Sequence, residues 1–136
     1  TVGYHNHAHE FAHSFDASTG SAPVTGSAPV SAFEAFAAQL APEVALEVDI
    51  YWAHVGGADA PALLTRLGDR VRAVHVKDGV GSDPADQLPA GAGEVPLAAA
   101  LDAATAAQYL VIEFDEYGGD LFEGIGQSLA YLRARA

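Results

Sequence analysis

Ionisable side chains recur at alternate positions near the ends of four otherwise apolar segments. They are His5 and His7 in the first segment, Glu47 and Asp49 in the second, His75 and Lys77 in the third, and Glu113 and Asp115 in the fourth. Alternate residues of a strand point to the same face, so each pair would share one face, opposite aliphatic residues. Burying several charges together is costly unless they neutralise one another or bind a cation. The pattern therefore predicts a metal site or an ion-pair cluster.

Carboxylates and imidazoles together suit divalent ions of intermediate hardness, such as Mn²⁺, Co²⁺, Fe²⁺, Zn²⁺ or Mg²⁺. Each residue also has a simpler interpretation on its own. A carboxylate at a strand end can cap a helix, and His75 can be a hydrogen-bonded core histidine. Lys77, the only lysine, can lie along the surface with its ammonium in water. The shared position of these residues on successive strands favours the metal site over these separate roles.

Alternating strands and helices are predicted to position these residues. Apolar segments predict strands at 2–7, 44–51, 71–76 and 109–114, and helices are expected at 31–40, 59–68, 96–108 and 121–135. Ser31 and Glu34 have capping-box spacing at the start of the first helix. Asp59 with Pro61 marks the start of the second helix, and Gly68 marks its end.

This alternation predicts an α/β fold with a parallel sheet. Four strand–helix units in 136 residues average 34 residues each, which matches a (β/α)₈ barrel of about 250 residues for eight units. The chain is therefore expected to be a half-barrel and a single domain, residues 1–136. A small doubly wound sheet is the competing architecture, but its Gly-rich phosphate loop is missing after the first strand. Both architectures place active sites at the carboxyl ends of their strands.

Composition narrows the classes of partner. The formal net charge is -12, so nucleic acid and anionic membranes are not expected as partners, because both require a basic surface. No run of about 18 apolar residues occurs, and cysteine is absent, which removes thiolate chemistry. A cytoplasmic location is expected. The start at Thr1 without methionine predicts a processed or partial chain, and the polar stretch 14–30, with near-copies at 20–24 and 26–30, predicts a surface loop.

Several motifs resemble the xylose isomerase-like (β/α)₈ barrel family, the sugar phosphate isomerases and epimerases. They are Gly3-Tyr4-His5-Asn6-His7 with Glu10-Phe11, Leu46 to Trp52 with Gly56 to Asp59, Arg70 to Asp78, Gly91 to Val95, and Tyr109 to Asp115. Their order corresponds to the last four strands of the family, so the chain resembles its C-terminal half. The first four strands are absent here, and the 14–30 stretch is longer than the compact family loop.

The resemblance implies one divalent metal, most simply Mn²⁺, held by ligands from these four strands. By match the ligands are Asp49, His75 and Glu113, with Glu10 as the fourth and His7 as its substitute. The substrate-binding residues implied are His5, His7, Trp52 and Lys77. The connection 77–94 would be a lid, with Gly79, Gly81, Gly91 and Gly93 as hinges.

The implied activity is isomerisation or epimerisation of a sugar or keto-sugar. A metal bound to the carbonyl oxygen stabilises the enediolate formed when the neighbouring carbon loses its proton. Glu113 and Glu10 are the expected acid/base pair, with a first-strand histidine as substitute for Glu10. A phosphodiesterase related to apurinic-site endonucleases is disfavoured by the negative charge. A keto-glycoside lyase or dehydratase and a catalytically silent half-barrel remain alternatives. Two open sheet edges predict a homo-oligomer or the remainder of a full barrel as partner.

Overall fold

The computed structural model describes residues 2–16 and 29–135. Its strands and helices follow one another along the chain in the order predicted, with some additional short elements. The elements are β1 (Gly3–His5), a 3₁₀ turn (Ala8–Phe11), β2 (Ser14–Asp16), β3 (Pro29–Ser31), α1 (Ala32–Gln39), β4 (Ala45–Asp49), α2 (Ile50–Val55), α3 (Ala60–Leu67), a 3₁₀ turn (Gly68–Arg70), β5 (Val71–Val76), β6 (Asp78–Gly79), a 3₁₀ turn (Pro84–Asp86), β7 (Gln87–Leu88), α4 (Leu97–Ala103), β8 (Tyr109–Ile112) and α5 (Leu121–Arg133).

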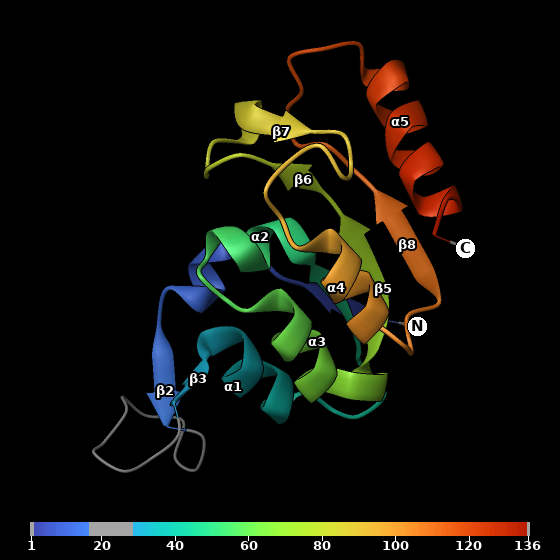
Figure 1. The fold of residues 1–136 in the computed structure, drawn as a ribbon. Coiled ribbons are helices and arrows are strands. Elements are labelled where there is room, and N and C mark those ends of the chain that lie inside the picture. Colours follow the sequence, from blue (N-terminus) through green and yellow to red (C-terminus); the bar gives the residue numbers. More distant parts are fainter. Residues whose placement is uncertain (1, 17–28, 136) are drawn as a thin grey trace.

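A four-stranded parallel sheet in the order β1-β4-β5-β8 forms the centre of the fold. Its register places His5 beside Glu47 and Asp49 beside His75. Figure 1 shows α3 and α4 side by side against the sheet, and the β6–β7 pair beyond the end toward which β5 points. The predicted α/β class with parallel strand–helix units, as in half of a (β/α)₈ barrel, is confirmed.

The aliphatic face of the sheet packs against the helices. Leu46 and Val48 of β4 and Val74 of β5 are fully buried, in a core completed by Leu63 and Leu64 of α3. The ionisable residues of the same strands point to the opposite face, because side chains alternate along a strand. One face of the sheet therefore packs against the helices, and the opposite face carries the polar cluster.

Helix starts follow the predicted signals. The Ser31 hydroxyl accepts a hydrogen bond from the Glu34 backbone N–H at 3.2 Å. In turn, the Glu34 carboxylate accepts a hydrogen bond from the Ser31 backbone N–H. Asp59 caps α3 in the same manner through the Ala62 N–H. Gly68 ends α3 with a φ of 55°, a value that glycine adopts without the steric cost of a side chain.

The second strand, predicted at 44–51, ends two residues earlier than expected. β4 stops at Asp49, and the residues expected to continue it form α2. Asp49 turns the chain because its carboxylate caps the new helix, accepting the Trp52 backbone N–H at 2.9 Å. Tyr51 consequently lies buried within a helix, and its hydroxyl donates to the Asp83 carbonyl.

Other boundaries also differ. The helix expected at 96–108 ends at Ala103, and the strand expected at 2–7 is shortened to Gly3–His5. The strand expected at 109–114 ends at Ile112, so Glu113 directly follows it. In the expected loop 14–30, β2 and β3 pair in antiparallel fashion, while the repeats at 20–24 and 26–30 lie almost wholly outside the described residues. None of the described helices is both long and apolar enough to cross a membrane.

Candidate metal and substrate site

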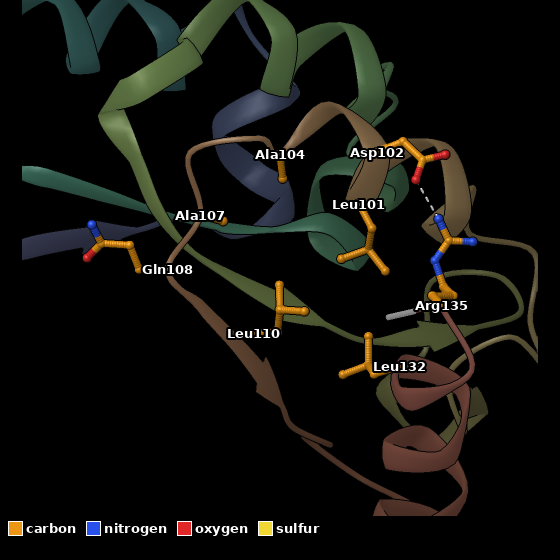
Figure 2. Close-up of a pocket in the computed structure, with 8 residues that line it drawn as sticks. All are labelled: Leu101, Asp102, Ala104, Ala107, Gln108, Leu110, Leu132 and Arg135. Carbon is orange, nitrogen blue, oxygen red and sulfur yellow. Dashed lines mark hydrogen bonds and ion pairs between the residues drawn. The ribbon is translucent and has the colours of Figure 1, made fainter.

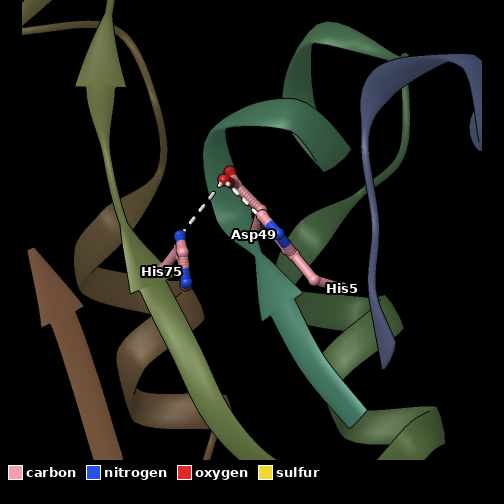
Figure 3. A group of neighbouring side chains, drawn as sticks. All are labelled: His5, Asp49 and His75. Atoms are coloured by element: carbon pink, nitrogen blue, oxygen red, sulfur yellow. Dashed lines mark hydrogen bonds and ion pairs between the residues drawn. The ribbon is translucent and has the colours of Figure 1, made fainter. Parts of the chain in front are cut away.

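Side chains from all four strands of the central sheet converge near their carboxyl ends. His5 Nε2 lies 3.3 Å from Asp49 Oδ2, and His75 Nδ1 lies 3.8 Å from the same oxygen. His75 Nδ1 also lies 2.5 Å from Glu113 Oε2. Figure 3 shows His5 and His75 approaching Asp49 from the two neighbouring strands. The sheet therefore brings together the three predicted ligands Asp49, His75 and Glu113, together with His5.

Asp49 is held in a fixed orientation. Its backbone N–H donates to Asn6 Oδ1 at 3.0 Å, and Asn6 Nδ2 donates to its carbonyl at 3.2 Å. Its Oδ1 accepts the Trp52 N–H, which leaves Oδ2 to face the histidines. Asp49 and Asn6 are both fully buried. Asn6 is thus a positioning residue, and it sits on the aliphatic side of the first predicted strand as the one polar exception.

His75 lies among three carboxylates. Its Nδ1 forms a hydrogen bond with Glu113 and faces Asp49, while Nε2 lies 3.2 Å from Glu47 Oε1. Carboxylates therefore face both ring nitrogens, and Glu47 lies beside the nitrogen that does not face Asp49 or Glu113.

Lys77 lies in the middle of the acidic groups. Its Nζ is 3.0 Å from Asp49 Oδ2 and 2.9 Å from both Glu113 Oε2 and Asp115 Oδ2. The side chain is 1 % exposed. Burial alone would lower the pKa of Lys77, but the charge of Asp49 and the hydrogen bonds to all three carboxylates raise it well above its usual value. Lys77 is therefore a buried ammonium whose charged form is favoured by three neighbouring carboxylates.

Gln87 fixes Asp115 on the far side of Lys77. Gln87 Nε2 donates to Asp115 Oδ2 at 2.7 Å, and Gln87 Oε1 accepts the Asp115 N–H at 2.7 Å. Gln87 is 2 % exposed. Neither its role nor that of Glu47 was predicted. Glu47 was recognisable from its alternation with Asp49, whereas Gln87 lies in a connection whose path no local pattern indicates.

The structure does not bring Glu10 to this cluster. One oxygen of its carboxylate accepts the Tyr4 hydroxyl and the other accepts the His7 backbone N–H. The hydrogen bond to Glu10, with burial in second place, raises the pKa of Tyr4 to about 12. Both oxygens of Glu10 are therefore engaged in holding the turn after β1, and His5, not Glu10, lies with Asp49 and His75 in the group of possible ligand atoms.

Two other predicted substrate residues lie beside the cluster. The His7 ring centroid is 5.1 Å from that of His5 and 6.5 Å from that of Trp52. His7 is exposed. Trp52 Nε1 is buried and has no hydrogen-bond partner among residues 2–16 and 29–135. A row of aromatic rings thus runs outward from the cluster.

The donor set fits a divalent cation. One ligand atom each from His5, Asp49 and His75 lies within 4.8 Å of the other two, so modest side-chain movements would bring all three to coordination distances of about 2.0–2.6 Å. Two imidazoles with carboxylates suit Mn²⁺, Co²⁺, Fe²⁺ or Zn²⁺. Glu113, in contact with His75, is the fourth residue within reach of the same ion.

Acid should weaken the fold through this cluster. Burial opposes ionisation of Asp115, but hydrogen bonds from Lys77 and Gln87 lower its pKa below the usual value. Burial also opposes ionisation of Glu113, but its contacts with Lys77 and His75 lower its pKa below the usual value. A carboxyl whose pKa is lower in the folded state stabilises the fold above its unfolded pKa, and this contribution disappears as pH falls through the folded pKa. We expect the thermal midpoint to fall below about pH 4, and to fall less steeply in Asp115→Asn. Equal slopes in calorimetric scans from pH 6 to pH 3 would contradict this expectation.

The connection 77–94 is anchored at both ends by Asp78. This carboxylate is 1 % exposed and accepts four backbone N–H groups, from Gly79, Gly91, Gly93 and Val95, at 2.8–3.1 Å. A Cβ on Gly93 would lie 2.3 Å from Asp78 Oδ1, and one on Gly79 would lie 2.9 Å from the Asp86 carbonyl oxygen. Gly79 and Gly93 therefore permit close packing around Asp78, and their expected role as hinges stays a prediction.

A pocket of about 390 Å³ lies elsewhere, between α4, β8 and α5. Its lining residues are Leu101, Asp102, Ala104, Ala107, Gln108, Leu110, Leu132 and Arg135. Figure 2 shows Arg135 paired with Asp102 at its edge, at 2.6 Å. Gln108 directly precedes β8, so this pocket lies toward the amino end of that strand and contains none of the cluster residues.

Comparison with protein-family models and with curated proteins found no match. Solved structures do match. A sugar phosphate isomerase/epimerase from Parabacteroides distasonis ATCC 8503 aligns with 97% of this chain and 44% of its own, with a TM-score of 0.74 and 27% identity. A second such structure from the same organism covers 96% of this chain and 44% of its own, with a TM-score of 0.71 and 20% identity. The predicted resemblance to this barrel family is confirmed, and the chain spans less than half the length of these structures.

Proposed function

We propose that this chain is the metal-binding, C-terminal half of a sugar isomerase or epimerase barrel, acting by proton transfer next to a carbonyl group. The observation that carries the proposal is the convergence of Asp49, His75 and Glu113, with His5, at the strand ends of a fold similar to sugar phosphate isomerase/epimerase structures. The substrate class is a sugar or keto-sugar, and Mn²⁺ is the preferred ion.

The chain's own residues have separate tasks in this reaction. His5, Asp49, His75 and Glu113 would hold the ion, which when bound supplies Lewis acidity to the substrate oxygens. The Glu113 carboxylate, whose pKa is lowered by Lys77 and His75 when no ion is bound, would take the proton from the carbon beside the carbonyl. His7 would supply a proton on the opposite side in preference to Glu10, whose oxygens are engaged. His7, Trp52 and Lys77 would orient the sugar.

Solvent isotope incorporation tests this proposal. The protein is incubated with Mn²⁺ and a panel of keto-sugars and sugar phosphates in D₂O, and the products are analysed by NMR and mass spectrometry. Proton transfer predicts deuterium on the carbon beside the carbonyl. Conversion without deuterium would contradict it, as would loss of water or of a glycosidic leaving group, which would indicate a dehydratase or lyase. A complete lack of conversion would favour the silent half-barrel.

The open edges of the sheet call for a further partner. β1 and β8 each pair on one side only within the described residues, and Tyr109 and Leu110 of β8 are 64% and 48% exposed. Such edges invite pairing with another strand, and we propose that a second copy or further polypeptide covers them. Intact mass with sedimentation analysis distinguishes these cases. A 14.0 kDa chain that sediments as a compact, cooperatively unfolding monomer would contradict both.

A further inference from the structure

The cluster already contains a cation, the ammonium of Lys77. It lies within hydrogen-bond distance of Asp49 Oδ2 and Glu113 Oε2. These two oxygens also face His5 and His75. An ion coordinated by them would therefore meet the ammonium at close range, and like charges repel strongly in a buried setting.

We propose that Lys77 offsets part of the negative charge of the metal-free site and is displaced from Asp49 and Glu113 onto Asp115 when a divalent ion binds. This inference rests on the metal site of the proposed function. The ammonium makes three charged contacts, so one positive charge is shared among three carboxylates when no ion is bound. Removing a partner from a buried ion pair is costly, so these contacts stabilise the metal-free fold.

The third contact provides the place to which Lys77 retreats. Asp115 is held by two hydrogen bonds to the buried Gln87, so its position does not depend on Lys77. Among the described residues, the Asp115 side chain pairs with Lys77 and Gln87 and with neither His5 nor His75, whereas Glu113 Oε2 lies 2.5 Å from His75 Nδ1. Asp115 can therefore keep its contact with the ammonium while Asp49 and Glu113 exchange Lys77 for the ion.

Nuclear magnetic resonance can observe this displacement directly, because Lys77 is the only lysine. Protein labelled with ¹⁵N at lysine Nζ should give a single ammonium signal, and Zn²⁺ is a diamagnetic probe. We expect the signal to move to a new position as Zn²⁺ is added, in proportion to occupancy measured by calorimetry. Full Zn²⁺ occupancy with an unchanged Nζ signal would overturn the proposal while leaving the metal site intact.

Metal affinity gives a second, independent readout. In Lys77→Met, which keeps the length of the side chain, we expect Mn²⁺ to bind about 10-fold tighter or more, and the metal-free protein to melt at lower temperature. Equal Mn²⁺ affinity in the two proteins would overturn the displacement. Absence of Mn²⁺ and Zn²⁺ binding in both would instead overturn the metal-dependent function and, with it, this inference.

A double-mutant cycle separates displacement of Lys77 from a direct effect of the Asp115 charge on the ion. It is measured by Mn²⁺ binding and requires no enzymatic activity. Asp115→Asn removes the charged partner of the displaced ammonium, so it should weaken Mn²⁺ binding when Lys77 is present. In the Lys77→Met background the same change should have little effect, because there is no ammonium to move. An equal loss of affinity in both backgrounds would mean that Asp115 acts only through its charge, and would contradict the proposal. If Lys77→Met does not fold, the Nζ measurement on the wild type still decides.

Discussion

Replacement of Glu113 by glutamine should lower isomerase or epimerase turnover by about 10²-fold or more, the usual contribution of a positioned acid/base group. Glutamine keeps the size of the side chain and retains an oxygen that can accept a hydrogen bond. It cannot take a proton from carbon. Steady-state turnover of the protein with Mn²⁺ and its best substrate measures the effect, and deuterium incorporation should fall in parallel.

Glu116→Gln is the matched control for this change, since Glu116 is an exposed carboxylate three residues further along the chain. Its turnover should equal that of the wild type. If Glu113→Gln folds with wild-type melting behaviour and keeps full turnover, the proton is transferred by another group, and the proposed role of Glu113 is wrong.

Asp78→Ala should have the largest effect on stability. The substitution leaves the backbone N–H groups of Gly91, Gly93 and Val95 without their acceptor. Since an unpaired buried donor costs about 1–3 kcal/mol, we expect the free energy of unfolding to fall by about 4 kcal/mol. Denaturant unfolding followed by circular dichroism measures it.

Asp86→Ala provides the comparison, because Asp86 lies in the same connection and is exposed. We expect it to change the free energy of unfolding by less than about 0.5 kcal/mol. Asp78→Asn, which retains one oxygen acceptor, should fall between the two. A loss in Asp78→Ala no larger than that in Asp86→Ala would show that the connection is not held by this carboxylate.

The repeating strand–helix units were predictable because their signals are local. β5 coincides with the predicted segment 71–76, and α3 begins and ends at its predicted capping residues. The end of β4 was missed because Ile50 and Tyr51 are as compatible with a buried strand as with a helix. Only the capping contact of Asp49 with Trp52 decides between them.

The cluster was predictable to the extent that parallel register determines it. Strand-end residues at neighbouring positions, such as Asp49 and His75, must meet once the strands pair in parallel. Glu10 lies beyond the end of β1, and its position depends on the turn that follows, which its own carboxylate helps to form. Gln87 reaches Asp115 across 28 residues of chain, a contact that no sequence period encodes.

The Asp78 anchor has a consequence for the time scale on which the site can open. Asp78 directly follows Lys77, so the connection cannot detach without freeing the backbone next to the buried ammonium. Opening would break three hydrogen bonds to one carboxylate together, which makes it a rare, cooperative event rather than a continuous motion. The amide protons of Gly91, Gly93 and Val95 should therefore exchange with solvent slowly and at one common rate, which would report how often the connection detaches from Asp78.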